Sequence, residues 1–118
     1  MTKYHPFAGR KGSATRNRFA RQLYADQHGA CGMCGQIVNP TLRGAKGSRD
    51  AVVDHKRPVR LRPDLAFDES NLWLICRRCH ATCDSIEKRN PEDDDRIAAE
   101  KAKHRPVGID GYMITNKA

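Results

Sequence analysis

Residues 76–80 read Cys76-Arg77-Arg78-Cys79-His80, and an earlier pair, Cys31 and Cys34, has the same two-residue gap. Two Cys-x-x-Cys pairs in one short chain are typical of a tetrahedral four-thiolate zinc site. Zinc bound in this way holds together the two ends of the segment between the pairs. The pattern predicts a structural zinc site made by Cys31, Cys34, Cys76 and Cys79, and the alternatives are a [2Fe-2S] cluster or free buried thiols.

The composition indicates a single domain with a thin apolar core. The chain has 118 residues, of which 38% are hydrophobic, and many of those are alanine or cysteine. Structural zinc contributes an apparent binding free energy of ~10–16 kcal/mol in small domains. We therefore expect folding to depend on the metal.

Cysteine usage and hydropathy favour a cytoplasmic protein. The chain has five cysteines, an odd number that argues against a framework of disulfides. It shows no hydrophobic leader after Met1 and no apolar run near the ~20 residues that span a bilayer. We expect a reduced protein with no membrane partner.

The excess positive charge lies in the N-terminal part of the chain. The formal net charge is +8, and residues 1–49 hold nine Lys or Arg against one acid, Asp26. Residues 50–118 are balanced, with thirteen of each sign. This placement indicates a surface that lies along the phosphates of a nucleic acid, although a solubilising face is the alternative.

Periodicity and turn residues predict a short series of elements. The N-terminal half of the chain is predicted to contain a flexible basic arm at 1–14 and a helix at 15–28 that begins at Thr15. A zinc knuckle at 31–35 and a basic loop at 39–50 follow. The C-terminal half is predicted to contain strands at 51–55 and 71–75, helices at about 78–89 and 91–104, and a loose tail at 107–118. Asn90 and Pro91 are the predicted start of the last helix.

The predicted order of strand, loop, strand and helix, with cysteines and histidine at the last junction, is a ββα arrangement around metal. Val53-Asp54-His55-Lys56-Arg57-Pro58 and the run from Asn71 to His80 resemble the HNH motif of ββα-metal nucleases. The Cys31–Cys34 pair resembles the cysteine pair of the zinc-containing branch of this family, which is common among small phage and bacterial HNH endonucleases. The resemblance covers roughly residues 15–90. It implies an α+β fold, a small zinc-stapled ββα-metal (His-Me finger) domain at 15–106 with flanking N- and C-terminal helices and a ββα core at about 51–89.

The resemblance also implies roles for four residues. His55 is the general base that activates water, Asp54 and His80 hold a divalent cation such as Mg²⁺, Mn²⁺ or Ni²⁺, and Asn71 orients the loop that carries His55. Adjacent residues on a straight strand point to opposite faces, so Asp54 and His55 reach one site only where the strand bends or ends. Without the motif, the Asp54-His55 step is typical of an ion pair at a strand end.

Seven arginines are candidate DNA contacts because they lie in the basic N-terminal part or near the predicted site: Arg16, Arg18, Arg21, Arg57, Arg60, Arg77 and Arg78. Any one of them can instead be a solvated surface residue. Cys83 stands where related sequences often carry a basic residue. It is either a small buried apolar residue or a competitor of Cys79 for zinc.

The resemblance implies a metal-dependent endonuclease that hydrolyses DNA phosphodiesters, by nicking or double-strand cleavage, with low sequence preference. The expected protein is a monomer that works beside the large subunit of a phage terminase, in the host cytoplasm if it is phage-encoded. Two alternatives stay open, a non-catalytic zinc module that binds nucleic acid and a structural adaptor of phage packaging.

Overall fold

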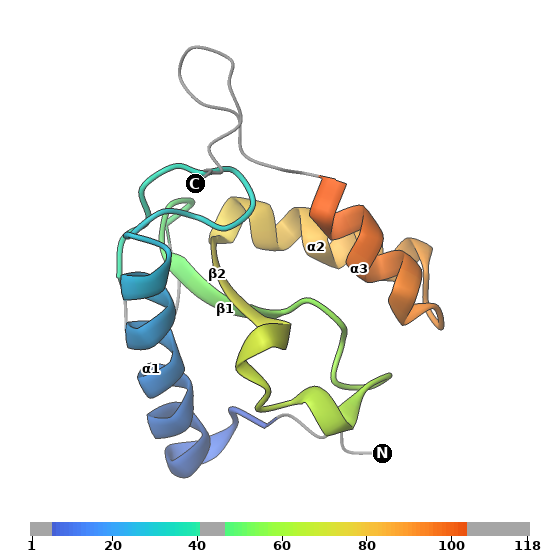
Figure 1. Ribbon diagram of the computed structural model, residues 1–118, viewed down its shortest axis with the longest axis horizontal. Helices are drawn as coiled ribbons and strands as arrows, with labels where there is room; N and C mark the ends of the chain where they lie inside the picture. Colours follow the sequence, from blue (N-terminus) through green and yellow to red (C-terminus); the bar gives the residue numbers. More distant parts are fainter. Residues whose placement is uncertain (1–5, 41–46, 104–118) are drawn as a thin grey trace.

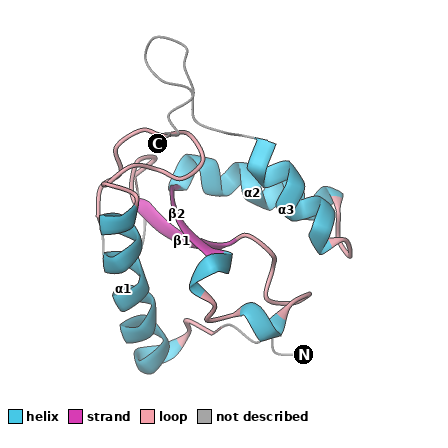
Figure 2. Ribbon diagram, in the orientation of Figure 1, coloured by secondary structure: helices cyan, strands magenta, loops and turns pink. Residues whose placement is uncertain are grey.

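The computed structural model describes residues 6–40 and 47–103. A two-stranded antiparallel sheet, β1 (Ala51–His55) with β2 (Leu72–Cys76), lies between helix α1 (Gly9–Asp26) and the helix pair α2 (Arg77–Arg89) and α3 (Asp94–Lys103) (Figure 1). Two single turns of 3-10 helix, Pro63–Leu65 and Glu69–Asn71, interrupt the connection between the strands (Figure 2). The predicted α+β class and ββα core are confirmed.

The register of the strands places the candidate site at one end of the sheet. Asp54 pairs with Trp73 and His55 with Leu72, at the last two positions of β1. At the other end Ala51 pairs with Cys76, which leads directly into α2. The two ends of this short sheet therefore carry different chemistry, with a carboxylate and an imidazole at one end and thiols at the other.

The core forms because one face of each helix is apolar. Cys79, Cys83 and Ile86 lie three or four residues apart on α2, so they share one face, and all three are buried. Cys79 and Cys83 belong to the same core cluster as Leu74 and Ile75 of β2, which are 1% and 0% exposed. No helix in the described parts of the chain has both the length and the apolar character to span a bilayer.

The N-terminal segment differs from the predicted flexible arm. Helix α1 begins at Gly9, six residues before the predicted start at Thr15, and Phe7 in front of it is buried. Gly12 makes this possible, because a Cβ at that position would lie 2.3 Å from the backbone carbonyl carbon of Phe7. The absence of a side chain at Gly12 thus lets the preceding segment fold back onto the helix, a tertiary contact that periodicity does not show. Residues 1–5 lie outside the described part.

The start of the last helix was also predicted wrongly. Helix α3 begins at Asp94, and Asn90 instead follows α2, where its Nδ2 donates to the carbonyl of Ile86 at 2.9 Å. The side chain of Asp93 accepts a hydrogen bond from the amide of Arg96 at 3.0 Å, which is the geometry of a helix N-cap. The predicted end near His104, the tail at 107–118 and residues 41–46 of the basic loop lie outside the described residues.

Candidate functional site

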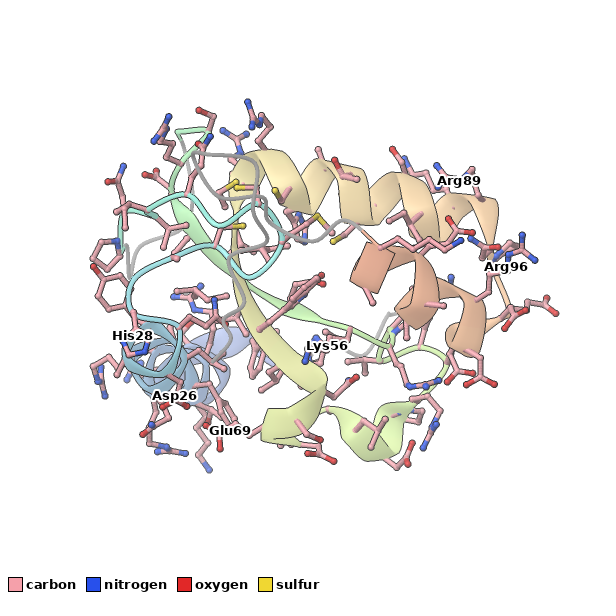
Figure 3. All side chains as sticks on the ribbon, turned by 45° about the horizontal axis from the view of Figure 1, so that its top comes forward. Asp26, His28, Lys56, Glu69, Arg89 and Arg96 are labelled. Atoms are coloured by element: carbon pink, nitrogen blue, oxygen red, sulfur yellow. The ribbon has the colours of Figure 1, made fainter. Side chains whose placement is uncertain are left out.

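The four predicted zinc ligands come together in one cluster. The sulfur atoms of Cys31, Cys34, Cys76 and Cys79 all lie within 4.8 Å of one another. The Sγ atoms of Cys34 and Cys76 are 4.0 Å apart, close to the separation of about 3.8 Å that Zn–S bonds near 2.3 Å impose on a tetrahedral site. Yellow sulfur atoms gather beside the first turns of α2 (Figure 3). The cluster fits a structural zinc ion.

Electrostatics supports a bound cation in this cluster. The Sγ of Cys31 accepts backbone N–H groups from Met33, Cys34 and Cys76 at 3.3–3.4 Å, the kind of contact that stabilises a thiolate. Burial and the neighbouring thiolates nevertheless raise the pKa of Cys79 far above its ordinary value. A bound metal ion would offset this repulsion and would allow all four sulfurs to bind as thiolates.

Cys83 lies outside the four-cysteine cluster. Its side chain is fully buried, and burial together with the charge of Asp54 raises the pKa of its thiol. It stays protonated at neutral pH and fills the core as a small apolar residue, the first of the two predicted possibilities.

Three of the predicted catalytic residues, Asp54, His55 and His80, line an open pocket of about 230 Å³, and the fourth, Asn71, is not among its lining residues. The end of β1, the loop after it, the segment before α1 and one face of α2 form its walls. Its titratable groups are Asp54, His55, Arg60, His80, Asp84 and Glu87. Asp54 and His55 both reach it because β1 ends at His55, so the alternation of a straight strand no longer applies.

Asp54 is held rigidly. It is 5% exposed, and its Oδ2 accepts hydrogen bonds from Trp73 Nε1 at 2.8 Å and from Lys101 Nζ at 3.0 Å. Its other oxygen, Oδ1, faces Nε2 of His80 at 3.8 Å. The carboxylate therefore has one oxygen occupied by protein donors and one oxygen directed at a histidine nitrogen.

His55 is oriented by a carbonyl and by an aromatic ring. Its Nε2 lies 2.9 Å from the carbonyl oxygen of Ala66, which only accepts hydrogen bonds, so Nε2 carries the proton and Nδ1 is the basic nitrogen. Phe7 stacks on the imidazole at a centroid distance of 5.3 Å and an interplanar angle of 21°. Together they fix the tautomer and the plane of the ring.

Asn71 crosses the loop that follows His55. Its side chain accepts from the amide of Arg57 at 2.9 Å and donates to the carbonyls of Arg57 at 3.1 Å and Leu65 at 3.4 Å. It is 5% exposed and thus ties three backbone groups together without water. This position suits the orienting role that the resemblance implies.

The predicted phosphate contacts divide into two groups. Arg57 forms ion pairs with Asp94 at 2.6 Å and Asp95 at 2.5 Å, which raises the pKa of Arg57 and lowers that of Asp94. Arg60 donates to the carbonyl of Pro91. These two arginines hold α3 and the segment before it against the loop, and their predicted contact with phosphate stays a prediction.

The remaining candidates lie on two helices. Arg16 is half-buried and donates to Asn17 Oδ1 at 2.9 Å. The others are exposed along α1 or at the start of α2: Arg18, Arg21, Arg77 and Arg78.

Sequence reasoning missed several residues of the pocket. Lys101 is 1% exposed and contacts Asp54, although no role was predicted for it from the sequence. Its spacing of four residues from Ile97, which is fully buried, was the available signal that it lies on the inner face. Asp84, one turn after His80, has Oδ2 at 3.9 Å from His80 Nδ1. Phe7 gave no signal, because the segment around it has no apolar period.

Comparison with known proteins identifies the segment that contains both clusters. Residues 31–83 match the family described as HNH endonuclease. Searches of curated proteins and of solved structures gave no match. The matched segment holds the four cysteines, both strands and the first half of α2. Over this segment, which is less than half of the chain, the protein is similar to HNH endonucleases.

Proposed function

We propose that the protein is a metal-dependent endonuclease that hydrolyses DNA phosphodiester bonds. The observation that supports this most is the shared pocket, in which His55, fixed in one tautomer, lies beside the Asp54–His80 pair. A family match supports a nuclease in general, and the pocket adds the groups that the reaction needs. These groups are a base for water and a pair of ligands for a cation.

The pair formed by Asp54 and His80 fits a divalent cation. Two ligands at bonds near 2.1 Å lie about 3 Å apart when they are adjacent in an octahedral shell, and the Oδ1–Nε2 distance is 3.8 Å. Because Asp54 is fixed by Trp73 and Lys101, the half-exposed His80 would have to rotate to close that gap, and the open pocket leaves space for water and phosphate. When bound, the cation supplies neutralisation of the charge that develops on the phosphate and on the leaving 3′ oxygen.

His55 then acts as the general base. Its Nε2–H is held by Ala66, so Nδ1 accepts the proton of the attacking water. Phe7 covers one face of the ring and keeps bulk water from it. Asn71 fixes the loop after His55 and thereby helps to position the imidazole ring at the pocket. The products are 5′-phosphate and 3′-hydroxyl ends, as the resemblance implies.

The exposed cations of α1 and α2 support binding that depends on charge more than on sequence. Arg18 and Arg21 are exposed on α1, while Arg77 and Arg78 are exposed where α2 begins. Phosphate contacts of this kind make the affinity fall steeply with salt concentration. The terminase partner rests on the resemblance alone, whereas the cytoplasmic location also rests on cysteine usage and hydropathy. The monomeric state is part of the same proposal.

A plasmid assay tests the proposed function. Zinc-loaded protein is incubated with supercoiled plasmid and Mg²⁺, Mn²⁺ or Ni²⁺, next to the His55→Ala variant. The proposal expects metal-dependent nicking by the parent and none by the variant, with unchanged zinc content and DNA affinity. If no ion supports nicking while the folded protein binds DNA, the chain is a binding module and the proposal fails.

One observation favours that second candidate, a non-catalytic zinc module that binds nucleic acid. The ammonium of Lys101 already pairs with Asp54, as a cation built into the site in place of a metal ion. The same assay separates the two functions, because a binding module retains plasmid affinity without nicking.

A further inference from the structure

Lys101 is the cation buried beside the candidate site. It lies on α3, outside the segment that matches the family. Among residues 6–40 and 47–103, no other lysine or arginine is buried. Its Nζ donates to His55 O at 2.7 Å, Glu87 Oε2 at 2.9 Å and Asp54 Oδ2 at 3.0 Å. All three ammonium donors are thereby used.

The charge on Lys101 is maintained by its neighbours. Burial opposes an ammonium, but Asp54 and Glu87 outweigh it and raise the pKa of the lysine above its ordinary value. A buried ion pair is a weak source of stability, since apolar residues of similar volume often do as well. Stability alone therefore does not explain a cation at this position, and its contacts with Asp54 and His55 point to the site.

The geometry restricts how Asp54 can bind a metal. Lys101 and Trp73 both donate to Oδ2, which leaves Oδ1, the oxygen that faces His80, for an ion. Lys101 also holds the carbonyl of His55, so one ammonium fixes both residues of the Asp54-His55 step. The step is thus positioned whether or not a metal is present.

The same charge opposes a divalent cation. An ammonium that contacts one oxygen of a carboxylate repels a metal ion bound to the other oxygen. The repulsion is strong here because both the ammonium and the carboxylate are nearly removed from water.

We propose that Lys101 is a positioning residue of the metal site, a built-in counter-ion that keeps Asp54 assembled, limits it to one ligand oxygen and holds the affinity for free divalent cations low. This inference rests on the proposed role of Asp54 and His80 as ligands. It adds a regulatory consequence, since an endonuclease with a weak metal site is active only at high concentrations of the free ion.

The test measures Mn²⁺ binding to zinc-loaded protein by calorimetry, together with thermal unfolding with and without Mn²⁺. The single variant Lys101→Met leaves the carboxylates of Asp54 and Glu87 without their ammonium partner. A double variant, Lys101→Met with Glu87→Gln, therefore removes one charge of each sign. We expect the double variant to bind Mn²⁺ at least about tenfold more tightly than the parent. Lys101→Arg keeps the charge and should keep the weak affinity.

The outcomes distinguish this inference from the proposed function. If Lys101 is purely structural, its replacement lowers the unfolding temperature equally with and without Mn²⁺ and leaves the dissociation constant for Mn²⁺ unchanged. That result would overturn the counter-ion role. The control Asp54→Asn tests the ligands themselves, and it should lose Mn²⁺ binding. If Asp54→Asn binds Mn²⁺ as the parent does, or if the folded parent and the double variant both bind none, the ligand assignment fails and this inference fails with it.

Discussion

Replacing Cys34 with serine removes one of the four sulfurs of the cluster at the least cost to packing. Cys34 is half-buried, whereas Cys31, Cys76 and Cys79 lie in the core with Leu74. The serine hydroxyl can therefore reach water, and the measured effect reports the lost metal bond. The variant isolates the contribution of zinc better than any change at the other three cysteines.

The expected magnitude follows from the strength of such sites. Structural zinc contributes ~10–16 kcal/mol of apparent binding free energy, so one of four ligands accounts for about 3–4 kcal/mol. Small domains have a total stability of about 5–15 kcal/mol, and the loss should lower the unfolding temperature by ~10–20 °C. Complete removal of zinc by a chelator should unfold the domain.

Thermal unfolding by circular dichroism, with zinc measured by atomic emission, checks this prediction. The matched control is Cys83→Ala, which removes a buried sulfur outside the cluster. It should keep one zinc per chain and lose only about 1 kcal/mol from the smaller side chain. If Cys34→Ser, or the chelated parent, unfolds at the same temperature as the zinc-loaded parent, zinc does not hold this fold together.

Three further predictions concern the pocket and its supports. Gly12→Ala should displace Phe7 from His55 and reduce nicking at unchanged zinc content, and equal activity would show that the stacking is dispensable. Asn71→Ala removes the side-chain partner of the amide and the carbonyl of Arg57, while the Leu65 carbonyl keeps the amide of Asp68, and should cost about 1–3 kcal/mol in urea unfolding. Arg57 lowers the pKa of Asp94, so this pair stabilises the fold above the ordinary carboxyl pKa and loses its effect as pH falls through the lowered value. Asp94→Asn should therefore weaken the dependence of urea unfolding on acid pH. An unchanged dependence would contradict the contribution of the pair.

The parts of the structure that sequence could predict are those with local or spaced signals. The two Cys-x-x-Cys pairs predicted the cluster, and short β-prone runs on either side of a proline-containing loop predicted β1 and β2 within one residue. The start of α3 was missed because Asn90 and Asp93 are both capping residues, and only the tertiary packing decides which of them caps.

The contacts of Phe7 and Lys101 were beyond prediction for a different reason. Each reaches the site from an element far away in the chain, and neither lies in the motif that marks the site. Phe7 precedes a helix whose start depends on the contact between Gly12 and Phe7. Lys101 is a lysine, a residue type that is rarely buried. The spacing of Lys101 from Ile97 indicates the inner face of α3, but no local pattern identifies the long-range partners of Lys101 or Phe7.

Single-turnover cleavage of a labelled duplex by His55→Ala, with and without added imidazole, tests the central claim most directly. The claim is that the nitrogen of His55 takes the proton of the attacking water in the pocket of Asp54 and His80. It predicts that the variant cleaves ~10²–10⁴-fold more slowly than the parent at equal zinc content, metal concentration and bound DNA, and that imidazole restores part of the rate. Cleavage by the variant at the rate of the parent would contradict it.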